Sequence, residues 1–203
     1  MIHKWINKKY LQEDEIKKIN SGFKKAKPYS NFALENFFNA EKLADLKNAV
    51  LAEKFEHVEK DLFSFSHTKD LVSSKNKKIK EFYNMLSSKE FILLMGKLTG
   101  IKLSSKIDMQ SHNLYRGDYL LFHDDELEGR GIAYIVYLSN FQKNDGGKLQ
   151  LYDLNNPSKP VKSIIPKLGT FTCFKVSKKS MHDVEEVIAK KERLTVGGWF
   201  YGN

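Results

Sequence analysis

One short segment of the chain combines residue types that bind metal ions. His123 and Asp125 follow the apolar run Tyr119–Phe122 and are separated by a single residue. Because alternate side chains of a strand share a face, we expect an imidazole and a carboxylate to point the same way and bind one ion. A third ligand must come from a distant strand. His182, 57 residues after Asp125, is the histidine in the downstream β-like region.

This ligand set has a known chemical use. Two histidines and one carboxylate form the facial triad of non-haem Fe(II) oxygenases, which leaves coordination positions open for a chelating co-substrate and O₂. Arg193 lies 11 residues after His182, and Thr195 and Gly197 alternate with it along the same run. Since a guanidinium grips a carboxylate with two hydrogen bonds, we expect Arg193, flanked by Thr195, to bind the far carboxylate of a keto acid.

Two tyrosines are expected to add hydroxyl donors to this pocket. Tyr137 follows the HDD segment in the next strand-like run, and we expect it to donate to the same carboxylate as Arg193. Tyr115 precedes the HDD strand, and we expect it at the metal-chelating end. A zinc metallohydrolase is an alternative use of the same three ligands, but it would have no need of Arg193 and Tyr137 to hold a keto acid.

Other residues of similar type have simpler explanations. Asp124 is expected to be a turn residue, and His112 to be structural and to line the pocket mouth. His57 and His67 fall in the half of the chain that looks helical, and we expect neither to be catalytic. Cys173 is the only cysteine, so internal disulfides are excluded. We expect it to be a small buried strand residue in a reduced, cytoplasmic protein, or a nuclear one if the source is eukaryotic.

Charge and composition limit the partners. The net charge of +9 comes almost wholly from lysine, since arginine occurs only at positions 116, 130 and 193. Nucleic-acid readers favour arginine for bidentate base contacts, so nucleic acid is not the expected substrate. No apolar run reaches the length of about 18 residues that a membrane span needs, and the first residues lack the apolar core of a secretory signal.

The elements that position these residues divide the chain in two. Helical periodicity predicts helices over 11–28, 40–53, 77–88 and 88–100, and a short strand over 31–38. Asn39 is a predicted helix N-cap, Ser87 or Ser88 caps the last helix, and Gly100 ends it. After residue 100, seven or eight short apolar or alternating runs are separated by turn signals such as Asn-Asp-Gly-Gly at 144–147, which is typical of a β-sandwich or barrel.

The fold class predicted from this pattern is α+β, with helices packed outside a jelly roll. We expect residues 1–30 to be an N-terminal helical extension and residues 31–203 to be a single domain. Within that domain, helices run to about residue 100 and the jelly roll starts at about 101. The loop ELEGRG at 126–131 is expected to border the substrate entrance and to close over it.

The chain resembles a known enzyme family in several segments. KIDMQSHNLY, GDYLLFHDD, AYIVYLSN, DGGKLQLYD, HDVEEV and RLTVGGWFY resemble the 2-oxoglutarate- and Fe(II)-dependent dioxygenases of the prolyl hydroxylase type. The likeness is greatest to the catalytic domain of the ribosomal-protein prolyl hydroxylases (Ofd/Tpa type), and it runs from about residue 31 to 201. It implies a double-stranded β-helix, Fe(II), 2-oxoglutarate and O₂ as cofactors and co-substrates, and ascorbate (vitamin C) as reductant.

Carried over by position, the resemblance implies that His123, Asp125 and His182 bind iron. Arg193 and Tyr137 would hold the distal carboxylate of 2-oxoglutarate, and Tyr115 would contact the other end of this co-substrate. Members of this branch usually carry a second, silent jelly roll, and we expect it to be absent here. The implied function is hydroxylation of a prolyl residue in a protein or peptide, with ribosomal proteins as candidates.

Three other functions stay open at this stage. One is hydroxylation of a free amino acid or another small molecule. A second is nucleic-acid demethylation, although such enzymes carry a second arginine six residues after the first, where this chain has Trp199. The third is a non-enzymatic jelly-roll binding module, against which the presence of all three metal ligands argues.

Overall fold

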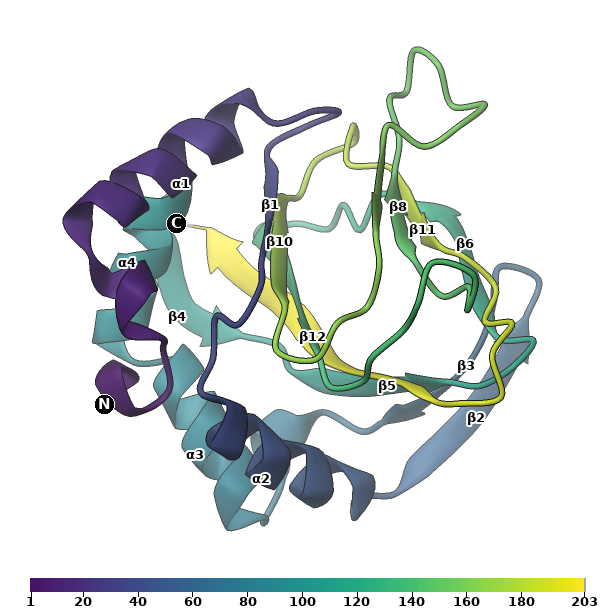
Figure 1. The fold of residues 1–203 in the computed structure, drawn as a ribbon, viewed down its shortest axis with the longest axis horizontal. Coiled ribbons are helices and arrows are strands. Elements are labelled where there is room, and N and C mark those ends of the chain that lie inside the picture. The colour runs from purple at the N-terminus through teal and green to yellow at the C-terminus, as the bar shows by residue number, and fades with distance from the viewer. Residues whose placement is uncertain (203) are drawn as a thin grey trace.

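The computed structural model describes residues 1–202, and its helices gather on one side of the molecule (Figure 1). Within this range the α-helices are α1 (Glu13–Lys25), α2 (Ala40–Leu51), α3 (Lys77–Leu86) and α4 (Lys89–Thr99). Short 3₁₀ helices span Ile2–Lys4, Lys8–Leu11 and Leu71–Ser73. No helix in the described range is both long and apolar enough to cross a membrane.

Local hydrogen bonds explain where the helices start and stop. The Asn39 side chain accepts from the backbone N–H of Lys42 at 3.1 Å, and Ser88 accepts from Phe91 N–H at 3.2 Å. Each bond satisfies a donor that the first helical turn leaves free. Gly100, with φ of 75°, ends α4 in the left-handed region that glycine adopts without steric cost. The predicted caps are confirmed.

The strands form one antiparallel sheet that curls around a central space (Figure 1). They are β1 (Asn31–Leu34), β2 (Phe55–Lys60), β3 (Phe63–Thr68), β4 (Leu103–Ile107), β5 (Gln110–Leu114), β6 (Tyr119–His123), β7 (Arg130–Tyr137), β8 (Leu149–Leu151), β9 (Lys162–Ile164), β10 (Phe171–Lys175), β11 (His182–Val184) and β12 (Arg193–Gly202). The order along the sheet is β1-β10-β7-β12-β5-β3-β6-β11-β8-β9, with β2 on β3 and β4 on β12. The predicted jelly roll with outer helices is confirmed.

Two details of the predicted elements were wrong. Residues 55–68, in the half expected to be helical, form the β2–β3 hairpin, and β3 joins the sheet between β5 and β6. Its FSFSHT sequence alternates Phe with Ser, which is the period of a strand. One of the short runs expected after residue 100, SSKIDMQSHNLY at 104–115, divides into β4 and β5, and both pair with β12.

Residues 1–30 pack into the same apolar core as the rest of the chain. Trp5, Ile16 and Phe23 are buried in it, and the Trp5 ring centre lies 5.1 Å from that of Phe82 on α3. A second cluster of buried side chains fills the space between the walls of the curled sheet, and it includes Tyr137, Leu149 and Phe174. The helices thus support one outer face of the sheet and leave the interior of the barrel for the site.

Candidate metal centre and active site

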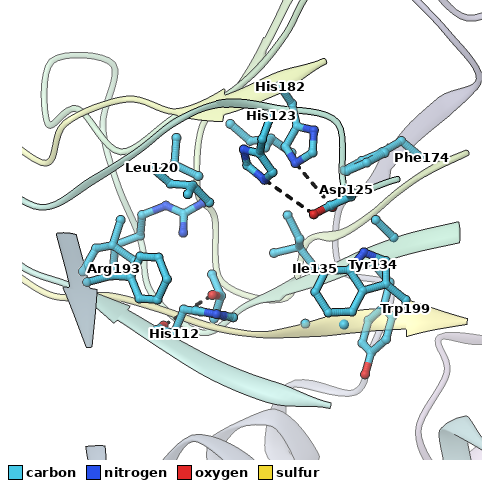
Figure 2. A pocket seen from close by; sticks show the side chains of 18 residues that line it. His112, Leu120, His123, Asp125, Tyr134, Ile135, Phe174, His182, Arg193 and Trp199 are labelled. Atoms are coloured by element: carbon cyan, nitrogen blue, oxygen red, sulfur yellow. Dashed lines mark hydrogen bonds and ion pairs between the residues drawn. The ribbon is translucent and has the colours of Figure 1, made fainter. Parts of the chain in front are cut away.

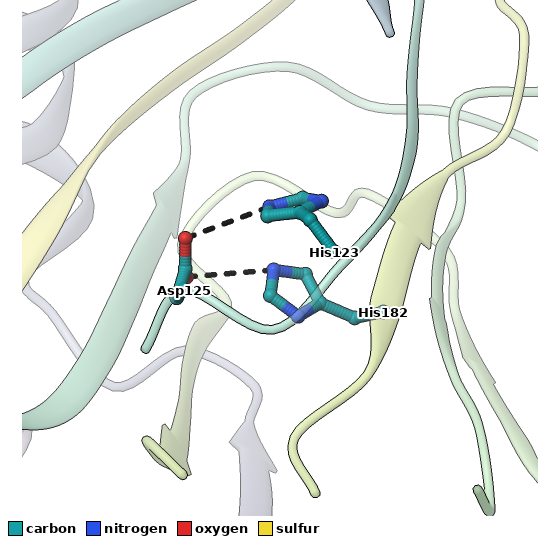
Figure 3. Close-up of side chains that lie close together, drawn as sticks. All are labelled: His123, Asp125 and His182. Atoms are coloured by element: carbon teal, nitrogen blue, oxygen red, sulfur yellow. Dashed lines mark ion pairs between the residues drawn. The ribbon is translucent and has the colours of Figure 1, made fainter. Parts of the chain in front are cut away.

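Three predicted ligands meet at one point inside the barrel (Figure 3). His123 is the last residue of β6 and His182 the first of β11, and the two are direct partners in the antiparallel pair. The Asp125 carboxylate lies 3.5 Å from His123 Nε2 through Oδ1 and 3.4 Å from His182 Nε2 through Oδ2. One metal ion bound at about 2.1 Å by ligands at right angles would separate their atoms by about 3 Å. The observed spacing fits such an ion.

Asp125 reaches this position by a different route from the one expected. The strand β6 ends at His123, so the alternation argument does not apply to Asp125. Its backbone has φ of 63°, in the left-handed region that Asp enters more readily than most residues. Arg130 Nη1 donates to the Asp125 carbonyl at 3.2 Å and so helps to hold this turn. The turn, rather than the pleat, brings the carboxylate to the imidazoles.

Backbone carbonyls fix how both imidazoles are protonated. Nδ1 of His123 lies 2.7 Å from the carbonyl oxygen of Leu121, and Nδ1 of His182 lies 2.7 Å from that of Ser180. A carbonyl only accepts, so each Nδ1 carries the proton and donates it. Each Nε2 lone pair then faces the Asp125 side. This is the usual arrangement behind histidine ligands of metal ions.

The charge of the site also suits a cation. Burial alone would raise the pKa of Asp125, but its close contacts with the imidazoles of His123 and His182 outweigh burial and hold that pKa well below its ordinary value. Asp125 is therefore a carboxylate anion at neutral pH. Together, one anion and two neutral nitrogen donors make the donor set that Fe(II) and related divalent ions accept.

These ligands stand on the wall of an internal cavity of about 220 Å³ (Figure 2). The sequence-based reasoning did not identify several side chains of its wall: Phe65, Leu120, Ile135, Phe174, Val184 and Trp199. Most are apolar strand residues that look like ordinary core in the sequence. Only the alternation of Trp199 with Gly197, Thr195 and Arg193 along β12 signalled an inward position.

Arg193 is a buried cation that lines the same cavity. Its side chain is only 2% exposed, and its Nε donates to the Gly147 carbonyl at 2.6 Å. Its Nη2 has no hydrogen-bond partner, and no salt bridge in the described chain involves it. Burial lowers the pKa of this guanidinium, because removal from water disfavours its charged form. A buried cation without an anion is costly, so the site fits the carboxylate of a ligand.

Tyr137 and Thr195 lie near Arg193 in different ways. Thr195, two residues further along β12, is on the cavity wall. The Arg193 guanidinium carbon lies 5.4 Å from the ring centre of Tyr137, which is fully buried behind the wall. The Tyr137 hydroxyl has no hydrogen-bond partner, and neither has that of nearby Thr172. Because buried polar atoms are normally paired, these free hydroxyls fit the predicted carboxylate end of a diacid.

A glycine pair holds the backbone that Arg193 contacts. Gly146 has φ of 75°, and a Cβ there would lie 2.0 Å from the Glu186 carbonyl oxygen. At Gly147, with φ of 65°, a Cβ would lie 3.0 Å from Arg193 Cδ. Only glycine fits both positions without distortion. The turn predicted at 144–147 therefore presents the carbonyl that orients the guanidinium.

The structure does not bring Tyr115 to the cavity, and the expectation for it was wrong. Tyr115 follows the last residue of β5, is 49% exposed, and its hydroxyl accepts from Asn113 Nδ2 at 2.9 Å. The preceding residue, Leu114, takes the inward position on the wall instead. Because a shift of one residue reverses the face of a strand side chain, Tyr115 points away.

The remaining predicted residues fall as follows. Asp124 is a turn residue as expected, since its Oδ1 accepts from Glu126 N–H at 2.9 Å. His112 lines the cavity, whereas His57 and His67 do not. Closure of the loop at 126–131 stays a prediction. Cys173 is buried in β10, as expected.

Comparison with known proteins assigns this geometry to a family. The family model described as 2OG-Fe(II) oxygenase superfamily matches residues 109–201, which include every metal ligand and Arg193. Residues 109–201 are thus a 2OG-Fe(II) oxygenase domain. Among curated relatives, this chain is 35% identical over 181 residues to prolyl 3-hydroxylase OGFOD1 of Xenopus laevis, covering 86% of this chain and 35% of the relative. The prolyl 3,4-dihydroxylase OGFOD1 of Ostreococcus tauri is 32% identical over 199 residues, with 86% and 38% covered. The chain thus spans about a third of the length of these relatives.

Solved structures show the same fold. A prolyl-4-hydroxylase of Pseudomonas putida superposes with a TM-score of 0.73 at 16% identity, covering 93% of this chain and 99% of that chain. A prolyl hydroxylase of Trichoplax adhaerens, solved with a hypoxia-inducible-factor peptide fragment, gives 0.73 at 15% identity and 96% coverage of both chains. At this level of identity the likeness concerns the fold alone.

Proposed function

We propose that this chain is an Fe(II)- and 2-oxoglutarate-dependent dioxygenase that hydroxylates a prolyl residue in a protein. The observation that carries the proposal is the presence, in one cavity, of a His-Asp-His ligand set and a buried arginine without an anion. The ligand set requires a metal ion, and the buried arginine requires a carboxylate. A zinc hydrolase accounts for the ligands but not for Arg193. The similarity to enzymes named prolyl hydroxylases supports the choice of substrate.

The side chains have separate tasks in this mechanism. Fe(II), 2-oxoglutarate and O₂, when bound, supply the oxidising chemistry. His123, Asp125 and His182 would hold the metal at the wall of the cavity. Arg193 would hold the far carboxylate of the co-substrate, with the free Tyr137 hydroxyl as a further donor and Thr195 beside it on the cavity wall. The largely apolar wall excludes water, which strengthens each of these electrostatic contacts.

The names of the relatives support a protein substrate, and we propose a ribosomal protein as the first candidate. The relatives bear the names prolyl 3-hydroxylase and prolyl 3,4-dihydroxylase, so C3 of the proline ring is the expected site of attack. Hydroxylation of a free amino acid is the competing hypothesis, and it is an outcome of the test below. We further propose ascorbate as the reductant that keeps the iron ferrous. A cytoplasmic or nuclear location suits a chain whose one cysteine is buried and unpaired.

Two measurements test this function. Anaerobic addition of Fe(II) and 2-oxoglutarate should give a weak visible charge-transfer band, which a zinc hydrolase would lack. Aerobic incubation with proline-containing peptides of ribosomal proteins should release succinate and add one oxygen atom to proline, as read by mass spectrometry. Hydroxylation of free proline but not of any peptide would select the small-molecule hypothesis. No charge-transfer band and no succinate from the wild type would refute the dioxygenase itself.

A further inference from the structure

His112 is a polar cavity residue that the site described so far does not use. It lies on β5, across the cavity from the three metal ligands and between the labelled positions of Arg193 and Trp199 (Figure 2). In the sheet it pairs with Thr195 on β12 and with His67 on β3. It therefore stands beside the space between the metal site and the arginine.

Neighbouring groups fix the His112 ring in place. The Phe65 ring packs edge-on against it at a centre distance of 5.1 Å, and the His67 ring stacks near it at 6.4 Å. The Thr195 hydroxyl donates to the His112 carbonyl at 3.3 Å, which adds to the strand pairing with β12. The imidazole thus has a defined orientation before any ligand enters, which reduces the entropy cost of a contact.

The imidazole is neutral and free to hydrogen bond. Burial lowers the pKa of His112 to about 4, and the nearby His67 and Arg193 add to this effect while Asp125 opposes it. A neutral imidazole has one N–H donor and one acceptor. Within residues 1–202, no side-chain hydrogen bond involves the His112 ring, and the Thr195 hydroxyl reaches only its backbone carbonyl. The ring N–H of His112 therefore lies at a largely apolar cavity without a hydrogen-bond partner in the described part of the protein.

We propose that His112 donates a hydrogen bond to a carboxylate oxygen of bound 2-oxoglutarate, as an anchor in addition to Arg193 and Tyr137. The inference rests on the proposed function. His112, Asp125 and Arg193 line the same cavity, so the imidazole lies beside the space that the co-substrate must cross between the metal site and the arginine (Figure 2). A carboxylate has about four lone-pair positions, so one arginine does not saturate it.

Calorimetric titration of 2-oxoglutarate into the Mn(II)-loaded protein without O₂ tests this contact and needs no turnover. The His112→Leu variant should bind 2-oxoglutarate about 10- to 100-fold more weakly than the wild type, the range for a hydrogen bond to a charged group. The His112→Gln variant keeps an N–H donor and should retain most of the affinity. His57→Leu is the matched control, because His57 lies on β2 and does not line the cavity, and its affinity should equal that of the wild type.

The outcomes separate the two levels of the proposal. Mn(II) affinity, measured first by electron paramagnetic resonance, should be equal in all four proteins and shows that each is folded at the site. Equal 2-oxoglutarate binding by wild type and His112→Leu overturns the role of His112 and leaves the dioxygenase proposal standing. Equal loss in His112→Gln and His112→Leu excludes the hydrogen bond. No 2-oxoglutarate binding by the Mn(II)-loaded wild type overturns the proposed function, and the inference with it.

Discussion

Replacing Arg193 by methionine should remove co-substrate binding without destabilising the protein. Methionine keeps an unbranched apolar stem and removes the guanidinium with its charge and donors. Arg193 is buried, has a free Nη2 and forms no salt bridge within the described chain. In the wild type without 2-oxoglutarate, this unpaired buried cation costs stability, and the variant no longer has that cost.

The expected magnitudes follow from the contacts. Removing a partner from a buried ion pair costs about 3–5 kcal/mol, so the affinity for 2-oxoglutarate should fall about 100-fold to a few thousand-fold. The change in stability has two opposing parts. The loss of the 2.6 Å bond from Nε to the Gly147 carbonyl costs about 1–3 kcal/mol. Loss of the desolvated charge recovers several kcal/mol. We expect unchanged stability or a gain of up to about 2 kcal/mol, which for a chain of this size is a Tm up to about 4–8 °C higher.

Calorimetry and thermal unfolding of the metal-loaded protein measure both effects. Wild type should gain Tm when 2-oxoglutarate is added, because a ligand of the native state stabilises it, and Arg193→Met should not. Arg116→Met is the matched control, since Arg116 is an exposed arginine away from the cavity, and it should behave as wild type. A variant that binds 2-oxoglutarate normally would refute the reasoning. So would one that unfolds about 2 kcal/mol more easily without the ligand, because Arg193 would then be a structural residue.

Three further predictions concern the support of the site. Gly146→Ala should cost several kcal/mol of stability in denaturant unfolding, because its Cβ would meet the Glu186 carbonyl oxygen at 2.0 Å in a left-handed turn; Gly22→Ala, at an open helical position, should not destabilise. The pKa of His112 is about 4 in the folded protein, against an ordinary value of 6.5. As the pH is lowered from 6.5 to 4, the unfolded chain takes up the proton before the folded protein does, so the free energy of unfolding should decrease by about 3 kcal/mol. His112→Leu should make the free energy of unfolding, measured with urea, less dependent on pH over that range, and an unchanged dependence would contradict the assignment. Arg130→Met removes the donor to the Asp125 carbonyl and should weaken Mn(II) binding about 10-fold. Equal Mn(II) affinity of this variant and the wild type would show that the Asp125 turn keeps its conformation without Arg130.

The nature of the site could be predicted because it depends on residue types with few alternatives. Only a small set of side chains binds metal ions, and His123, Asp125 and His182 were found from type and order. Arg193 followed from its position in a strand that alternates inward. The prediction for Tyr115 was wrong although it used the same rule as the prediction for Arg193. That rule depends on strand register, which decides the face on which a side chain lies. One residue of shift put Leu114 in the cavity and Tyr115 outside it.

Helix ends were predictable because they depend on bonds between residues three positions apart. Asn39, Ser88 and Gly100 all act within one turn of their helix. The β2–β3 hairpin was missed because the preceding helices dominated the pattern of that half. Its role becomes visible only in the sheet, where β3 connects β5 to β6 and supplies Phe65 to the cavity.

The sequence by itself determined the chemistry of this protein, namely two imidazoles, one carboxylate and one guanidinium in β-forming segments. Those identities are fixed by the side chains and do not depend on folding. The tertiary structure alone decided that His123 and His182 are partners across β6 and β11, that Asp125 arrives through a left-handed turn, and that His112 faces the cavity. The physical reason is that these positions depend on strand register and sheet closure, which are set by contacts between residues far apart in the chain.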